Sequence, residues 1–368
     1  MNASQSSSNG KKLLWPVTAV FIGALAALNP FYTPDISVPV GITAWFADMA
    51  LVLLLSVHPM TARLGILAAG LFLAVPCFLG SSSLARSLLM CCMAFPLAIA
   101  TAPLFAPPTS NFRAQLGWFF SWRETGKIER RRRSFEVASL LHLIAAAATF
   151  TVATFCVKSV SAVGCWLLLR WLAGGIMILA FAETVTASHD LLTHLMGIKS
   201  PALMRSPILS TSIGEFWTRR WNVAASALLF RPIFFKPFAR RGVALGLFAS
   251  FFFSGFAHVL LAFMAMRRWE ISLVCGAFFA VQPLLILAER KMKVRCWPTA
   301  AARTWTLAAL AITSPLFVEP AIQLVTPSLR LTDNVLWSTV AMLGFTVVIN
   351  LFFSVGQLIA CPKLQLQK

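Results

Sequence analysis

The stretch GVALGLFASFFFSGFAHVLLAFMAM, Gly242 to Met266, decides the fold of this chain. It carries no Asp, Glu, Lys or Arg. It is also long enough to cross the hydrocarbon core of a bilayer, which takes about 20 apolar residues. Lipid offers the backbone no hydrogen-bonding partner, so a run of this kind has to be a helix. Its one ionisable side chain, His258, is costly to bury and is therefore the first candidate for a functional residue.

The composition extends this interpretation to the whole chain. The 368 residues are 58% hydrophobic and only 12% charged, whereas a soluble domain carries about 25% charged residues. The sequence therefore predicts an all-α, polytopic integral membrane protein with about ten transmembrane helices. The predicted spans are Leu13–Phe31, Val40–Val57, Leu64–Leu79, Leu84–Leu104, Val137–Val157, Val163–Ala182, Gly242–Met266, Ile271–Leu287, Thr304–Val325 and Val335–Ile359.

Polar and basic stretches divide the chain into three parts. Residues 1–106 are predicted to form the N-terminal transmembrane helices, and residues 107–135 a basic cytoplasmic loop. Residues 136–368 form the transmembrane core expected to carry the activity. This core contains a polar and aromatic segment at 207–241 and the histidine-bearing helix at 242–266.

Basic residues are in large excess, with 31 Lys and Arg against 12 Asp and Glu and a net charge of +19. Most lie in the loops on one side of the predicted bundle, as the positive-inside bias of membrane proteins produces. This distribution argues against a nucleic acid partner and predicts that both termini are cytoplasmic. The membrane is a bacterial inner membrane or the endoplasmic reticulum, depending on the host. The basic loops are also suited to anionic lipid headgroups or to a phosphorylated co-substrate.

A second unusual stretch, PILSTSIGEFWTRRWN, spans Pro207 to Asn222. It places aromatic, basic and acidic residues and an asparagine in a short polar segment. The following residues, Asn222 to Arg241, alternate aromatic and basic residues and contain two prolines that are expected to break any helix. This part is too basic to span the bilayer and fits an interfacial helix or a re-entrant segment.

Other chemistries find little support in the sequence. The eight cysteines lie in or beside apolar runs and contain no CxxC pair, which indicates packing residues rather than a metal or disulfide framework. His189 and His194 are five residues apart, whereas two ligands on one helix face would be four apart. No metal site is therefore predicted. His142 lies alone in its span and fits an interhelical hydrogen bond.

A transporter is the alternative from a different class. It would need charged residues spread over several spans along a pathway. The spans hold only a few such residues, including Asp48, Arg170 and Glu319, and these fit polar contacts within the bundle equally well.

The motif at Pro207–Asn222, followed by SGFAH at Ser254–His258, resembles the membrane-bound O-acyltransferase family. Within that family it is similar to the plant-type wax synthase branch. The matching pattern is P-x-L-x-x-S-x-x-E-F-W-x-x-R-W-N, met by Pro207, Leu209, Ser212, Glu215, Phe216, Trp217, Arg220, Trp221 and Asn222. The resemblance is strong over about Ser188 to Ala265 and elsewhere rests on hydropathy.

The resemblance implies a helical bundle with a central tunnel and transfer of an acyl group from acyl-CoA to the hydroxyl of a lipophilic alcohol. Acyl-CoA is then a co-substrate, and no permanently bound cofactor is expected. The family's catalytic histidine corresponds to His258 and its motif asparagine to Asn222. A short-chain acyltransferase that acetylates a natural-product or sterol hydroxyl remains open, because the sequence does not give the width of the tunnel.

A hydroxyl is a poor nucleophile until a base removes its proton, and a neutral imidazole in an apolar site can do so. Asn222 is suited to donate to the oxyanion or to orient the acceptor. Trp217 and Trp221 fit either the acyl-CoA entrance or interfacial anchors. Arg219 and Arg220 are candidates to pair with the phosphates of CoA. The alternative is that they only contribute to the positive charge of the cytoplasmic side. Arg231 and Lys236 are further candidates for these phosphates.

Three more residues are assigned to positioning the substrates: Ser254, Glu215 and Phe216. Ser254 lies one helical turn before His258, so it is also conceivable as a nucleophile that forms an acyl-enzyme. The family resemblance points instead to direct transfer between the two substrates. Glu215 is expected to hold the motif through a pair with an arginine.

Overall fold

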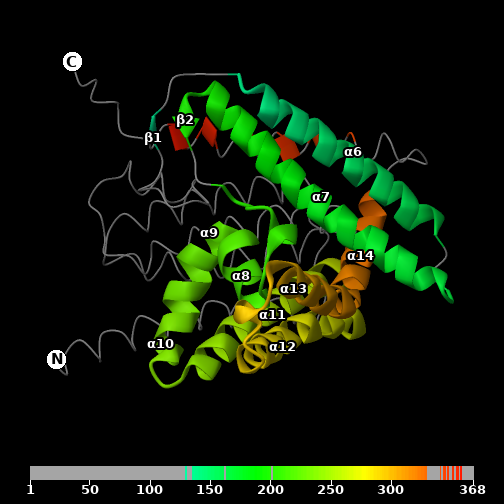
Figure 1. Ribbon diagram of the computed structural model, residues 1–368. Helices are drawn as coiled ribbons and strands as arrows, with labels where there is room; N and C mark the ends of the chain where they lie inside the picture. The colour runs from blue at the N-terminus through cyan, green and yellow to red at the C-terminus, as the bar shows by residue number, and fades with distance from the viewer. Residues whose placement is uncertain are drawn as a thin grey trace, which may run out of the picture.

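The computed structural model describes residues 129–130, 135–160, 163–199 and 202–329, together with single positions between 340 and 358. This part of the chain is mostly helical (Figure 1). Four of its helices are long and apolar enough to cross a membrane: α6 (Val137–Ser159), α7 (Trp166–Leu195), α11 (Val243–Met266) and α12 (Trp269–Lys291). The helical membrane architecture is therefore confirmed. The four predicted spans before residue 107 lie outside the described residues, as does most of the last predicted span.

Helices α6 and α7 form a long antiparallel hairpin (Figure 1). The prediction that the second of these spans ends at Ala182 is wrong, because α7 continues to Leu195. Its polar extension is supported by α6: His142 Nε2 lies 3.3 Å from a carboxylate oxygen of Glu183. His194, near the end of α7, makes a similar contact of 3.3 Å with Glu136. Polar residues can continue a helix when a neighbouring helix supplies their partners.

Helices α11 and α12 form a second antiparallel hairpin, and two glycines let them approach closely. A Cβ atom at Gly276 would lie 2.5 Å from Val259, and one at Gly255 would lie 3.0 Å from the Cβ of Phe279. Small residues at a crossing allow helix backbones to pack tightly inside a membrane. This contact sets the distance between the histidine helix and α12.

The predicted span Thr304–Val325 is two helices, α13 (Thr299–Thr313) and α14 (Pro315–Leu329), which meet at a bend of 52° when α14 is measured to Leu324. Proline has no backbone N–H and clashes with the preceding turn, so Pro315 starts the new direction. The bend carries α14 between α7 and the α11–α12 pair (Figure 1). There Glu319 lies 3.5 Å from Arg170 and accepts a hydrogen bond from the Trp171 indole.

The segment between α7 and α11 is a series of short elements. It begins with a two-residue strand, β2 (Ile198–Lys199), antiparallel to β1 (Glu129–Arg130). The 3-10 helix η4 (Pro207–Leu209), α8 (Ile213–Glu215) and the π-helix η5 (Phe216–Arg220) follow. The segment ends with α9 (Val223–Ala225), the π-helix η6 (Ser226–Phe235) and α10 (Lys236–Ala239). The prediction that Pro232 and Pro237 break the helix is wrong, because Pro232 lies inside the π-helix η6 and Pro237 lies in the first turn of α10. A proline in the first turn of a helix leaves no hydrogen bond unmade, since the N–H there has no partner within the helix.

Candidate active site

The motif segment begins at a helix start that a hydroxyl and a carboxylate stabilise. The Ser212 hydroxyl caps α8 by accepting the backbone N–H of Glu215 at 2.9 Å. Glu289 of α12 accepts the backbone N–H groups of Ile213 at 2.7 Å and Gly214 at 3.1 Å. The first N–H groups of a helix have no partner within it, so this buried carboxylate fixes the motif to α12.

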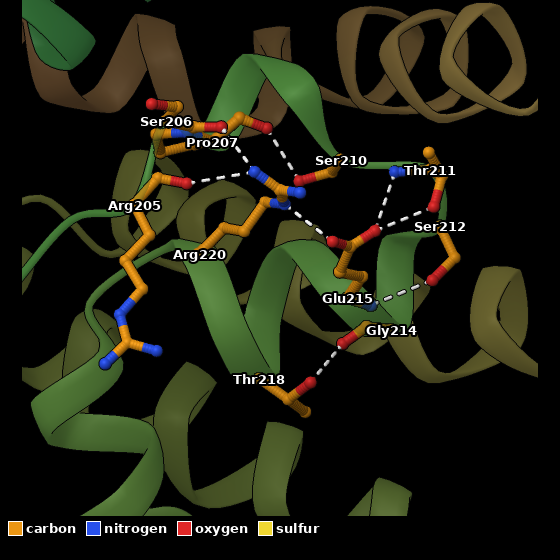
Figure 2. Close-up of polar contacts among 10 residues, drawn as sticks. All are labelled: Arg205, Ser206, Pro207, Ser210, Thr211, Ser212, Gly214, Glu215, Thr218 and Arg220. Atoms are coloured by element: carbon orange, nitrogen blue, oxygen red, sulfur yellow. Dashed lines mark hydrogen bonds and ion pairs between the residues drawn. The ribbon is translucent and has the colours of Figure 1, made fainter. Parts of the chain in front are cut away.

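Glu215 and Arg220 are the centre of a second network (Figure 2). One Glu215 oxygen accepts from the backbone N–H and the hydroxyl of Thr211, at 2.9 and 2.8 Å. The other accepts from Arg220 Nε at 2.7 Å, so the pair expected for Glu215 is present. Arg220 Nη1 also donates to the carbonyls of Arg205 and Ser206. Most of the bonding capacity of Arg220 is therefore used inside the segment.

The surroundings of Glu215 favour its charged form. Burial by itself would raise the pKa of this carboxyl, but the hydrogen bonds from Thr211 and the hydrogen bond and charge of Arg220 outweigh burial. The pKa of Glu215 is therefore held below its usual value of 4.5. The carboxylate stays ionised at neutral pH and keeps its hold on the arginine.

Asn222 ends the motif in a left-handed conformation, with φ of 43°. Asparagine tolerates this backbone better than most residues. Its side-chain oxygen accepts the N–H of Ala225 at 3.2 Å and so caps α9. Its own backbone N–H points to the sulfur of Met204 at 3.2 Å. No hydrogen bond joins Asn222 to His258 in the described part of the chain, and the geometry gives Asn222 a role in turning the backbone.

Trp217 connects the motif to the helix bundle. Its ring centroid lies 5.7 to 6.0 Å from the rings of Phe251, Phe278 and Phe279. Its indole N–H donates to the side-chain oxygen of Gln282 at 3.0 Å, and this amide is fully buried on α12. The other two motif aromatics complete a small stack, since the Phe216 ring lies 5.5 Å from Trp221 and 5.0 Å from Trp217.

His258 reaches the same aromatic cluster from α11. Its ring lies 4.2 Å from Phe279 and 5.9 Å from Phe317 of α14. Its Nδ1 lies 2.7 Å from the backbone carbonyl of Ser254. A carbonyl can only accept, so this contact requires a proton on Nδ1, and in the neutral imidazole Nε2 then carries the free lone pair. Phe279 contacts both His258 and Trp217 and is the link between the two parts predicted from the sequence.

The remaining predicted site residues are Arg219 and Ser254. Arg219 is exposed and pairs with no carboxylate among the described residues. Arg205, which was not among the predicted site residues, is also exposed, and its guanidinium points away from the Glu215 network (Figure 2). Ser254 is buried and contacts His258 through its backbone carbonyl.

Two polar groups of α12 that hold the motif, Gln282 and Glu289, were not predicted from the sequence. Gln282 is an amide in the middle of an apolar run, directly before Pro283. A polar side chain inside a predicted membrane span is costly, and this could have marked Gln282 as a site residue. Glu289 falls just outside the predicted span, so its sequence position is that of an ordinary loop residue.

Comparison with known proteins agrees with these observations. Residues 200–281 match the family model described as "Membrane bound O-acyl transferase family". The chain is 32% identical over 140 residues to the protein named "Probable long-chain-alcohol O-fatty-acyltransferase 2" of Arabidopsis thaliana, covering 35% of this chain and 39% of the relative. It is 34% identical over 134 residues to number 3 of the same series, also from Arabidopsis thaliana, covering 32% and 38%.

A third relative, number 7 of that series, is 32% identical over 148 residues, covering 35% of this chain and 42% of its own. The matches thus span about two fifths of the relatives' length. The family match contains both the complete motif and the histidine helix. Over residues 200–281 this chain is therefore similar to the membrane-bound O-acyltransferase family, and the relatives that it matches are named long-chain-alcohol O-fatty-acyltransferases.

Proposed function

We propose that the protein is a membrane O-acyltransferase that moves an acyl group from acyl-CoA to the hydroxyl of a lipophilic alcohol. The observation that carries this proposal is the hydrogen bond of His258, which sets the tautomer of its neutral imidazole. A hydrogen bond to the Ser254 carbonyl holds Nδ1–H and leaves Nε2 as a base inside an aromatic cluster. The names of the relatives, long-chain-alcohol O-fatty-acyltransferases, favour a long acyl chain and a long-chain alcohol.

In the proposed reaction, Nε2 of His258 removes the proton of the acceptor hydroxyl as its oxygen attacks the thioester carbon. The tetrahedral intermediate expels the CoA thiolate, and His258 returns the proton to that sulfur. The Nδ1 contact with Ser254 stabilises the imidazolium that exists between the two transfers. Phe279 and Phe317 exclude water, which would otherwise compete with the alcohol for the thioester.

The other site residues are proposed to act on substrate position. Trp217 and Trp221 form the aromatic side of the entrance for acyl-CoA, and Phe216 supports both rings. Arg219, which is exposed, is proposed to pair with the phosphates of CoA. Glu215 and Arg220 support this entrance from inside the segment. Asn222 sets the backbone direction after the motif, in addition to any contact with the acceptor.

For the whole chain we propose about ten transmembrane helices around a central tunnel, with both termini in the cytoplasm. The four long helices and the bent α13–α14 pair would supply the C-terminal part of that bundle. Labelling of single cysteines introduced near each terminus, in sealed vesicles, tests the orientation. Labelling of either terminus from the outer side would exclude the proposed topology.

The proposed activity is tested with purified protein in nanodiscs. Radiolabelled palmitoyl-CoA and acetyl-CoA are each supplied with a panel of long-chain alcohols and sterols, and ester formation is compared between wild type and His258→Ala. Ester from palmitoyl-CoA that disappears in the folded variant supports the proposal. A preference for acetyl-CoA would instead identify a short-chain acyltransferase, and equal activity in both proteins would exclude His258 as the base.

A further inference from the structure

The helical segment from Ser226 to Arg241 has one side that the protein itself covers. The Phe234 ring stacks on Phe253 of α11, with ring centroids 4.2 Å apart. Phe235 lies against Gly246, where an added Cβ would approach the Phe235 carbonyl to 2.9 Å. Phe234 and Phe235 therefore pack against the first half of α11.

The exposed side carries cations. Arg231, Lys236, Arg240 and Arg241 are all exposed. No Asp or Glu occurs between residues 216 and 269, and the preceding carboxylate, Glu215, is occupied by Arg220. Among the described residues, none of these four cations has a carboxylate partner. The segment thus presents a row of uncompensated positive charge on its free side.

The position of this row is defined by α11, which begins at Val243 directly after the last arginines. A helix of 24 residues is about 36 Å long at 1.5 Å per residue, slightly more than the hydrocarbon core of about 30 Å. An α11 that stands upright and centred in the bilayer would bring its first turn to the headgroup layer and the cationic row just before it to the depth of the lipid phosphates.

The spacing of the cations favours ligands that are spread over a surface rather than one compact group of phosphates. From Arg231 to Arg241 the row extends over on the order of 15 Å of helix, so the charges do not converge on one point. A nucleotide site would gather its cations around one group of phosphates. A leaflet with anionic headgroups presents many phosphates spread over a surface, and an extended row of cations can contact several of them at once.

We propose that the cationic face formed by Arg231, Lys236, Arg240 and Arg241 binds the anionic phospholipids of the leaflet at which α11 begins. Each lysine or arginine at an anionic surface strengthens binding by about fivefold. The aromatic face fixes the segment to α11, so lipid binding holds the segment that follows the motif at the membrane surface. This proposal stands on charge and exposure and is independent of the acyltransferase activity.

The test uses full-length protein in detergent and native mass spectrometry to count bound phosphatidylglycerol and phosphatidylcholine. The triple variant Arg231→Gln, Lys236→Gln and Arg240→Gln is compared with a control, Arg290→Gln, Lys291→Gln and Lys293→Gln. The control removes three exposed cations at the end of α12, beside the carboxylate of Glu289. We expect the first triple to weaken phosphatidylglycerol binding about tenfold or more, and the control by less than about threefold. Equal losses in both would overturn the proposal.

Two more measurements distinguish a lipid site from loss of folding and from a nucleotide site. If the glutamine triple is destabilised, Arg231→Lys with Arg240→Lys keeps the charge and is expected to bind phosphatidylglycerol like wild type. Weak binding by this folded lysine variant would overturn the proposal. Free CoA, which carries no acyl group to transfer, is then added to wild-type protein. Retained phosphatidylglycerol supports a lipid site, whereas displacement by CoA would assign the row to the nucleotide.

Discussion

The motif segment from Arg205 to Ser226 and the helices around His258 are stabilised in different ways. The segment is a series of short helices, and side chains satisfy their ends and the turns between them: Glu215, Arg220 and Glu289 bind main-chain or neighbouring groups. Around His258 the contacts are ring against ring, with one hydrogen bond to the imidazole. The comparison indicates that most of the motif residues hold the segment in place, whereas His258 is the candidate for the proposed chemistry.

The strongest test of this contrast compares His258→Ala with Ser254→Ala. Loss of a general base lowers the rate by about 100- to 10,000-fold. Ser254 contacts His258 through its carbonyl, which alanine keeps, so the second variant should stay within about threefold of wild type. Steady-state kcat and acyl-CoA binding are measured for both. A collapse of activity in Ser254→Ala with a burst of acyl-enzyme in wild type would revive the nucleophile hypothesis.

The next largest effect is expected from Glu289, which has no proposed role in the chemistry. Glu289→Ala leaves the buried N–H of Ile213 and the partly buried N–H of Gly214 without their acceptor and should destabilise the protein by about 3 kcal/mol. Glu289→Gln keeps one acceptor oxygen and should lose about half as much. Thermal unfolding in detergent gives the ranking. Equal stability of all three proteins would show that α12 does not hold the motif.

Removal of the Glu215 charge should have a smaller and pH-dependent effect. Glu215→Gln is expected to lose about 1–2 kcal/mol at neutral pH, because a charge-assisted bond to Arg220 is replaced. The folded pKa of Glu215 lies below 4.5, so the stabilisation is complete above that pH and is lost as the pH falls through the folded pKa. The difference in Tm between the two proteins should be constant from pH 8 to about pH 5. A difference that already shrinks near pH 6 would contradict this pKa direction.

The smallest expected effect concerns the link between the two regions. Trp217→Phe removes the indole N–H and Gln282→Leu removes its acceptor, and a double-mutant cycle should give a coupling of about 1 kcal/mol in stability. If Trp217 lines the entrance, both variants raise KM for acyl-CoA more than they lower kcat. Additive effects would mean that the bond does not join the motif to α12.

Most of the fold that the structure describes could be predicted, because apolar length alone requires a helix in lipid. The ends of α11 match the prediction within one residue at each end. The prediction failed where helices are polar or kinked: α7 extends past Ala182 because α6 supplies partners, and Pro315 divides one expected span into two. Local hydropathy gives neither the residues of α6 that pair with the end of α7 nor the bend between α13 and α14.

The candidate site was predicted in part for the same reason. A histidine in an apolar run and a cluster of charged and aromatic residues stand out by their types, and the family motif joined them in one interpretation. Gln282 and Glu289 were missed because their importance depends on what they face across the bundle. Arg220 was predicted either to pair with the CoA phosphates or to be plain positive-inside charge, and its hydrogen bonds to Glu215 and two backbone carbonyls could not be read from the sequence.

The sequence by itself determined the helical membrane class, the motif and the choice of His258, since these follow from hydrophobicity, length and residue type. Only the tertiary structure decided which nitrogen of His258 is free, which motif residues serve as structural bonds, and that Phe279 brings Trp217 and His258 together. Some of these contacts are local, such as that of His258 with Ser254, and others join residues far apart in the chain, such as Trp217 and Phe279. All of them depend on hydrogen-bond direction and on the close packing of rings, which residue types alone do not specify.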